Sequence, residues 1–314
     1  MFAAGFAHQE CFFMQDIDSI RINFNAEQLT LLNICLAFIM FGVALDLQIE
    51  YFKKVFRSPR VLAVGLASQL LGLPLLTLGL IYLLRPNPSL AFGMLLVAAC
   101  PGGNVSNYAT HLSKANTALS VAMTTISTLG AVLLTPLIFS SLTPLLPEGE
   151  ALSRQVSVDP WSMVWSIVQL ILIPLAAGLV FRHYLPYLTA RILGPIQRLS
   201  MVIFLSFVVF ALYGNFSNIV RYLDLVFLLV AIHNGSALAM GYFWAKWNKV
   251  GEANARAIAL ETGIQNSGLG LVLVFNFFDG LGGMAIIAAW WGIWHLISAF
   301  SLAMFWRRKG VGRM

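Results

Sequence analysis

The segment SLAFGMLLVAACPGGNVSNYATHLSK, residues 89–114, decides the fold of this chain. It is long and apolar enough to cross a bilayer as a helix, which takes about 20 residues. Pro101, Gly102 and Gly103 fall near its middle, however. Proline removes a backbone donor and clashes with the preceding turn, and glycine is a poor helix former. Because the polar Asn104 follows directly, the segment is predicted to form two half-helices separated by a break.

A second segment, ARAIALETGIQNSGLGLVLVFNF at residues 255–277, is interrupted in the same way. Gly263, Gln265 and Asn266 fall near its middle, and Glu261 precedes them. A carboxylate at bilayer depth costs about 2.5–3.5 kcal/mol on insertion scales, and such groups usually have a function. The alternative is a structural carboxyl that a neighbour keeps protonated.

The composition places both segments in a polytopic membrane protein. Of 314 residues, 59% are hydrophobic and 10% are charged, and the mean hydropathy is +0.82. Soluble domains carry about 25% charged residues. An ordinary soluble enzyme, a disordered chain and a nucleic-acid-binding protein are therefore excluded. The three cysteines show no paired spacing, so neither a disulfide framework nor a zinc site is indicated.

The apolar pattern predicts nine membrane spans and no β-strand. They cover residues 29–47, 61–84, 89–112, 116–141, 162–181, 199–216, 223–245, 255–277 and 283–306. Residues 1–26 are too polar to span and are predicted to form an extracellular or periplasmic tail, with a short surface helix at residues 3–14. The transporter itself would then occupy residues 27–314.

The basic residues of the predicted loops set the orientation. Fifteen of the nineteen Lys and Arg residues fall on one side of a nine-span arrangement. Cytoplasmic loops carry the excess of positive charge. The N-terminus is therefore predicted outside and the C-terminus in the cytoplasm, in the cell (inner) membrane.

The two interrupted spans are five positions apart, and an odd offset inverts the direction of the second. Interrupted helices in corresponding positions are typical of inverted repeats. The last five spans would form one repeat, and the first four the other, short of its first helix. At each break, carbonyl groups near Cys100 and Thr262 would attract cations, and N–H groups near Asn104 and Asn266 would attract anions.

A polar stripe supports a cation site at the breaks. Ser120, Thr124 and Ser127 stand at i, i+4 and i+7 on one face of the fourth span. Such hydroxyls often only bond their own helix or pack against a neighbour. Together with Ser106, Asn107 and the buried carboxylate, they have the pattern of hard oxygen ligands for a small cation.

Other polar residues inside the spans are less specific. Gln69 is the only amide of the second span and lies within reach of the same region. Lone histidines such as His233 and His295 more often donate an interhelical hydrogen bond than bind a ligand. His295 is the better functional candidate, because the repeat places its helix beside a break. Asp46, at the end of the first span, is expected to extend to the interface.

These segments resemble a known family. CPGGNVSN at 100–107, LSVAMTTISTL at 119–129 and ETGIQNSGL at 261–269 closely resemble signature segments of the bile acid:sodium symporter family, and the segment at 38–59 looks like that family's start. The resemblance covers the chain from about residue 27. A nine-helix count without the first helix is similar to the animal bile-acid carriers, whereas many bacterial relatives have ten helices.

The resemblance implies two moving parts and two sodium sites. The core would comprise the spans at 61–84, 89–112, 116–141, 223–245, 255–277 and 283–306, and the panel those at 29–47, 162–181 and 199–216. The first sodium site would use Ser106, Asn107, Ser120, Thr124 and Glu261. The second would use the side chains of Gln69, Glu261 and Gln265, with backbone carbonyls near Thr262 and Ile264. Substrate contacts would come from Asn104, Asn266 and His295.

The function that the resemblance implies is sodium-coupled import of an organic anion, a bile acid or a related small carboxylate, by alternating access with two sodium ions. The expected partners are this anion and the lipid bilayer, with no organic cofactor, nucleic acid or obligate protein partner. The chain is not expected to be an enzyme.

Two alternatives stay open. One is an exporter of the same superfamily, for a metalloid (arsenite) or for another organic anion. A metalloid exporter would be expected to use a reactive cysteine in its broken helix and to couple to protons, but Cys100 precedes Pro101 instead of following it. An intramembrane hydrolase would need a serine–histidine or paired-aspartate site. His233 and Ser236 offer the residue types, but no GxSG motif or pair of midplane aspartates accompanies them.

Overall fold

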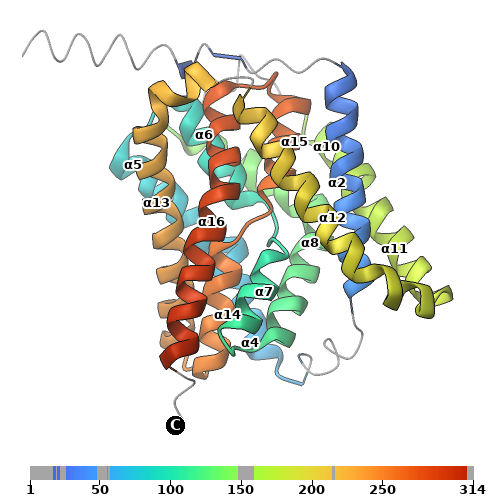
Figure 1. Ribbon diagram of the computed structural model, residues 1–314. Coiled ribbons are helices and arrows are strands. Elements are labelled where there is room, and N and C mark those ends of the chain that lie inside the picture. The colour runs from blue at the N-terminus through green and yellow to red at the C-terminus, as the bar shows by residue number, and fades with distance from the viewer. Residues whose placement is uncertain are drawn as a thin grey trace, which may run out of the picture.

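The computed structural model describes residues 17–18, 20–21, 26–47, 55, 57–147, 159–213 and 216–309. Its regular elements in these residues are all helical (Figure 1). The surface helix expected at residues 3–14 lies outside the described residues, as does most of the 1–26 tail.

The helices follow the predicted spans. In the first part of the chain they are α2 (Ala26–Asp46), α4 (Pro59–Ala67), the π-helix η1 (Ser68–Gly72), α5 (Leu73–Leu84), α6 (Pro88–Ala99), α7 (Val105–Leu112), α8 (Thr117–Leu142) and the short 3₁₀ turn η2 (Thr143–Leu145). The second part holds α10 (Pro160–Ile167), the π-helix η3 (Val168–Leu172), α11 (Ile173–Tyr184), α12 (Pro186–Tyr213), α13 (Phe216–Trp247), α14 (Glu252–Gly263), α15 (Ser267–Phe277) and α16 (Gly282–Lys309).

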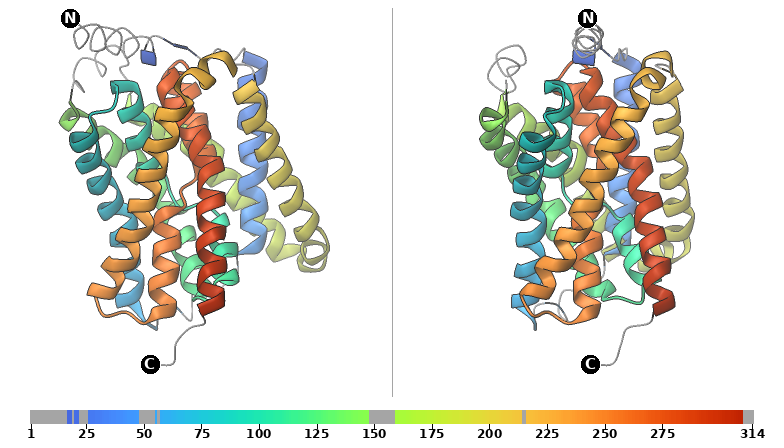
Figure 2. Two further views of the ribbon diagram at one scale, coloured as in Figure 1. Left: turned by 60° about the vertical axis from the view of Figure 1, so that its left-hand side comes forward. Right: turned by 90° about the vertical axis from the view of Figure 1, so that its left-hand side faces the viewer.

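Six helical runs among the described residues are long and apolar enough to cross a membrane. They are Glu27–Asp46, Pro59–Leu84, Thr117–Leu145, Pro160–Tyr184, Asp224–Trp247 and Gly282–Lys309. Two shorter apolar helices, α6 and α15, each belong to one of the interrupted segments. In Figure 2 the long helices run side by side, and the start of α2 and the end of α16 lie at opposite ends of the bundle.

Two predicted loops are helical instead. α12 begins at Pro186, although residues 182–198 were expected to connect two spans, and α13 begins at Phe216, before the expected start at 223. Proline is well suited to the first turn of a helix, and arginine is a good helix former, so Arg191 and Arg198 do not interrupt α12. An apolar stretch of sequence shows which part of a helix lies in the bilayer. It does not show at which residue the helix begins.

Both predicted interruptions are present, and they meet. α6 is followed by Cys100 in extended backbone, and α14 is followed by Ile264 in extended backbone. The two extended segments pair antiparallel at Gly102 and Gln265. The Gly103 N–H donates to Ile264 O at 3.0 Å, and the Asn266 N–H donates to Pro101 O at 2.8 Å. In Figure 1 the two extended segments, one between α6 and α7 and one between α14 and α15, cross in the middle of the molecule.

The helices fall into two groups around this crossing. α2 packs along α11 and α12, and these helices lie to the right in Figure 1. α14 packs on α13 and α8, whereas α16 packs on α6, α13 and α15. The broken helices therefore lie in one group, and α2 of the other group contacts α15 at the crossing side.

Candidate functional site

The site is centred on the carboxylate of Glu261, in the last turn of α14. The side chain is fully buried. Its Oε1 accepts hydrogen bonds from the hydroxyls of Ser106, Ser120 (2.5 Å) and Thr124 (2.8 Å). Three hydroxyls from two other helices thus meet one carboxylate oxygen, and an α-helical turn places Ser120 and Thr124 on the same face of α8.

Asn107 completes this group. Its Oδ1 accepts the Ser120 hydroxyl at 2.9 Å and the Thr124 hydroxyl at 3.4 Å. The structure therefore brings together all five residues that the sequence places in the first sodium site. Ser127, the third member of the polar stripe, does something else: its hydroxyl accepts the N–H of Gly102 at 3.1 Å and so holds the first break in place.

The residues expected in the second sodium site lie on the other side of the carboxylate. Gln69 lies in η1, the π-helical turn within the run Pro59–Leu84. The Nε2 atom of Gln69 donates to Glu261 O at 3.4 Å. Gln265 Nε2 donates to Thr262 O at 3.0 Å. The Ile264 carbonyl accepts the Gly103 N–H, so its second lone pair is the one left for a cation.

Three buried oxygens of this group have no hydrogen-bond partner among the described residues. They are Oε1 of Gln69, Oε1 of Gln265 and Oε2 of Glu261. A buried polar atom left unpaired costs about 1–3 kcal/mol. A carboxylate, amide and hydroxyl oxygens together are the donor set that hard cations prefer. The chemistry of these residues therefore fits a small hard cation.

Gly102 faces the carboxylate at very short range. A Cβ atom on Gly102 would lie 2.6 Å from Glu261 Oε2 and 2.8 Å from Gln69 Nε2. Real Cβ atoms do not approach other atoms so closely. Glycine is therefore required here to leave the space between the backbone of the first break and these two side chains.

A cavity adjoins the crossing on the side of α2. Asn104, Asn266 and His295, the three residues expected to contact substrate, all line it. α7 and α15 both begin at its wall, and their first N–H groups make this end favourable for an anion. Asn266 Oδ1 accepts the Leu269 N–H at 3.0 Å, so the amide NH₂ of Asn266 is its group available to a ligand.

Sequence reasoning missed Ser267 at the same wall. The side chain is 3% exposed, lines the cavity, and has no hydrogen-bond partner for its hydroxyl among the described residues. The Nδ1 atom of His295 is likewise buried without a partner. The position of Ser267, directly after Asn266 at the start of α15, was the one signal available in the sequence.

Side chains from neighbouring helices hold the carbonyl ends of both broken helices. The Thr135 hydroxyl of α8 donates to Ala99 O at 2.8 Å, and Asn234 Nδ2 of α13 donates to Gly263 O at 2.7 Å. The Ser298 hydroxyl donates to Asn234 Oδ1 at 2.6 Å. His233, the neighbour of Asn234, instead shares a 2.7 Å hydrogen bond with Thr77.

Replacing Asn234 by alanine is expected to lower the stability of the protein by about 1–3 kcal/mol, because the buried Gly263 carbonyl loses its partner. It should also raise the sodium concentration needed to stabilise the protein, since Gly263 lies between Thr262 and Ile264, whose carbonyls are expected in the second sodium site. Thermal unfolding over a sodium titration measures both effects. Ser298→Ala is the control, because it leaves the Asn234–Gly263 hydrogen bond in place. Equal effects of the two variants would contradict this role of Asn234.

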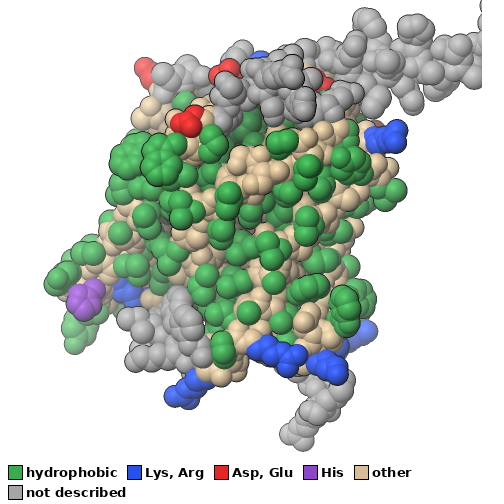
Figure 3. All heavy atoms as spheres, turned by 180° about the vertical axis from the view of Figure 1, so that it is seen from behind, with side chains coloured by type: hydrophobic (Ala, Val, Ile, Leu, Met, Phe, Trp, Pro, Cys, Tyr) green, Lys and Arg blue, Asp and Glu red, His purple; other side chains and the backbone are tan. Residues whose placement is uncertain are grey.

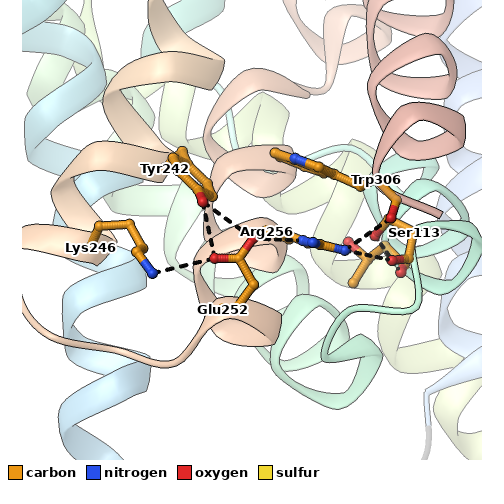
Figure 4. A network of polar contacts seen from close by, with 7 residues as sticks. Ser113, Tyr242, Lys246, Glu252, Arg256 and Trp306 are labelled. Atoms are coloured by element: carbon orange, nitrogen blue, oxygen red, sulfur yellow. Dashed lines mark hydrogen bonds and ion pairs between the residues drawn. The ribbon is translucent and has the colours of Figure 1, made fainter. Parts of the chain in front are cut away.

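A polar network ties the ends of α7 and α14 that lie away from the crossing to their neighbours (Figure 4). Arg256 Nε of α14 donates to Glu252 Oε1 at 2.8 Å, and its Nη1 donates to the carbonyls of Trp306 (3.2 Å) and Ser113 (3.5 Å). Tyr242 and Lys246 of α13 also bond Glu252. Since Ser113 caps α7, one guanidinium joins α7, α14 and α16.

The chain is similar to known sodium-dependent transporters. Residues 33–222 match the Sodium Bile acid symporter family. The uncharacterized sodium-dependent transporter YocS of Bacillus subtilis is 36% identical over 278 residues, which cover 88% of this chain and 83% of that protein. The probable chloroplastic sodium/metabolite cotransporter BASS2 of Oryza sativa subsp. japonica is 34% identical over 282 residues, 90% of this chain. The chain spans 65% of the length of that rice protein.

The helical fold, the buried oxygen cluster and these relatives define the class: an integral membrane protein that works as a sodium-dependent transporter and not as an enzyme. The chain belongs to the sodium bile acid symporter family.

Proposed function

We propose that the protein is a symporter that imports an organic anion by alternating access, driven by two sodium ions. The observation that carries the proposal is the set of unpaired buried oxygens around Glu261, beside the crossing that borders the cavity. Asn107, Thr124 and Gln265 of the proposed cation sites also line that cavity, so the cations and the substrate would bind next to one another.

The first sodium ion is assigned to Ser106, Asn107, Ser120, Thr124 and Glu261. The mutual distances of these side-chain oxygens support this assignment, since all five meet within hydrogen-bond range. The second ion is assigned to Gln69, Gln265 and Glu261 with the carbonyls of Thr262 and Ile264. The three unpaired side-chain oxygens support it, because a cation there would give each of them a partner.

The substrate carboxylate is assigned to the cavity end of the crossing. Asn104, Asn266 and His295 would contact it, together with Ser267. Two helix N-termini at one wall support this placement. So do the Ser267 hydroxyl and His295 Nδ1, which have no hydrogen-bond partner among the described residues.

We assign nine spans in inverted repeats. Six of them are the long helical runs, and the other three are α6 with α7, α14 with α15, and α12. The turns support the repeat. Among the described residues, the non-glycine residues with positive φ are Arg85, Lys114, Lys249 and Asp279, with φ of 46–56°. These four turns flank the two broken segments in corresponding pairs. The group with α2, α11 and α12 would be the panel, and the other the moving core.

Charge supports a cytoplasmic C-terminus in a cell membrane. Figure 3 shows one face with a broad hydrophobic middle, most Lys and Arg side chains at the end near the close of α16, and the acidic side chains at the opposite end. α16 itself finishes with exposed Arg307, Arg308 and Lys309. Because an excess of basic residues is typical of the cytoplasmic side, we assign the start of α2 to the outside.

The mechanism follows from the shared carboxylate. Cation binding would offset the buried charge of Glu261 and fix α7, α8 and α14 relative to one another. The N-termini of α7 and α15 would then be held in position for the anion, and the core would move against the panel to open the cavity to the other side. Two sodium ions down a tenfold gradient supply about 2.8 kcal/mol, and one net charge across 100 mV adds about 2.3 kcal/mol. Together they support roughly a thousandfold or greater accumulation of a monoanion.

The exporter alternative fits less well. Cys100 is 1% exposed and is not among the described residues that line the cavity. A thiol acting on a metalloid would need access to it. Cys100→Ala should therefore leave metalloid resistance of expressing cells unchanged.

Transport by the purified protein in liposomes tests the proposal. We expect uptake of at least one labelled carboxylate, chosen from bile salts and small organic acids by thermal shift, to need an inward sodium gradient and to carry inward current. Compounds that stabilise the protein in sodium but not in potassium are the candidates. Uptake at equal rates in sodium and potassium would contradict the proposal.

A further inference from the structure

One acidic side chain lines the cavity at the end away from the crossing. Asp46 is the last residue of α2, and the cavity wall includes it together with Tyr108, Gln197 and Ser200. The sequence alone suggested an acid that extends to the interface, and the structure adds that Asp46 lines the cavity. Gln197 of α12 lies beside the Asp46 carboxylate and lines the same cavity.

The two ends of the cavity have opposite polarity. At the crossing, the positive N-terminal ends of α7 and α15 face it. At the other end, α2 finishes with the negative pole of its helix dipole, and Asp46 adds a carboxylate. Arg182 of α11 interacts electrostatically with the Asp46 carboxylate, and its guanidinium donates to the backbone carbonyl of Leu45 at 2.5 Å. It is not among the cavity-lining residues.

One turn of α7 separates a residue at the crossing from a residue near Asp46. Asn104 caps α7 at the crossing, and Tyr108, one turn later on α7, lies within electrostatic range of Asp46. Four residues of α-helix rise about 6 Å. Between the ends, the wall is apolar, with Ile39, Met40 and Val43 of α2 along it.

From this polarity we propose that the cavity takes a zwitterion: a carboxylate that binds at the crossing and carries a protonated amine at its far end, next to Asp46. The inference rests on the proposed sodium-coupled function and replaces its monoanion by a carboxylate that also carries an amine. Such a molecule has no net charge, so two sodium ions would carry two charges inward in each cycle. A plain fatty acid would leave the Asp46 carboxylate facing a methyl group and would bring a second negative charge into the same cavity. A terminal amine would give that carboxylate an opposite charge and a hydrogen-bond donor.

Binding of matched probes to the full-length protein tests the inference. The probes are ω-amino acids of four to six carbons and unsubstituted fatty acids of the same lengths, each titrated by thermal shift in sodium. The wild type is expected to bind the best amino acid at least about tenfold more tightly than its fatty-acid counterpart, a difference of about 1.4 kcal/mol. Asp46→Asn should remove this preference, and Asp46→Ser is the second variant. Asp224→Asn, an exposed acid outside the cavity wall, should keep it.

A titration with sodium alone, without any organic probe, tests the sodium-coupled function separately from the zwitterion inference. If sodium stabilises the wild type but both series bind equally, or neither binds, the zwitterion inference is overturned and the sodium-coupled function stands. The same holds if Asp46→Asn and Asp46→Ser keep the preference for amino acids. If sodium does not stabilise the wild type at all, the proposed function fails and the inference fails with it.

Discussion

Glu261→Gln is expected to reduce sodium-dependent uptake by at least about a hundredfold. The substitution keeps the shape of the side chain but removes the negative charge that both proposed cation sites share. Losing one partner of a buried ion pair costs about 3–5 kcal/mol, and each 1.4 kcal/mol is a factor of ten in affinity. Initial rates of uptake into liposomes under an inward sodium gradient measure the effect.

The matched control is Glu27→Gln, which neutralises an exposed acid in the first turn of α2. It should transport at the wild-type rate. Folding of the Glu261→Gln protein is checked by its thermal unfolding in potassium, where no stabilising cation is expected. Sodium-independent uptake by Glu261→Gln at the wild-type rate would refute the assignment of the carboxylate.

Gly102→Ala is expected to weaken sodium binding by about ten- to a hundredfold. The added methyl group would lie 2.6 Å from Glu261 Oε2 and 2.8 Å from Gln69 Nε2, so both groups must move away from their present positions. Forcing one extra carbon into a packed site costs about 1–3 kcal/mol. Because these groups belong to the second proposed site, the cost should fall on sodium affinity. A sodium titration of uptake, at saturating substrate, measures it.

Gly79→Ala is the control for the same change. Gly79 lies in α5, and a Cβ atom there would have no described heavy-atom neighbour within 4 Å. This variant should keep the wild-type sodium dependence. If Gly102→Ala had the same sodium dependence as Gly79→Ala, the space at Gly102 would have no part in cation binding.

The breaks and the residues around Glu261 were open to prediction from the sequence. Pro101 followed by two glycines is unusual inside an apolar span and has few explanations. The same is true of a carboxylate such as Glu261. Helical spacing then places Ser120 and Thr124 on one face of α8, which the hydrogen bonds to Glu261 confirm. That these residues bind sodium stays a prediction, since geometry alone gives the fit and not the occupant.

Other features depend on tertiary packing that no local pattern encodes. A lone amide such as Asn234 has many possible partners, and only the packing of α13 on α14 selects the Gly263 carbonyl. Asp46 has the position of an interfacial acid in the sequence. It lines the cavity together with Gln197 of α12, a helix that starts earlier than its hydrophobic window. Helix starts of this kind are set by proline and by neighbours, not by hydropathy.

Equilibrium binding of radioactive sodium to the purified protein tests the central claim most directly. We expect saturable binding of two sodium ions per chain in the wild type. Potassium at the same concentration should not inhibit this binding, and Glu261→Gln should abolish it. A wild-type protein that binds no sodium, or a Glu261→Gln protein that binds as much as the wild type, would contradict the claim that this buried carboxylate holds the coupling ions.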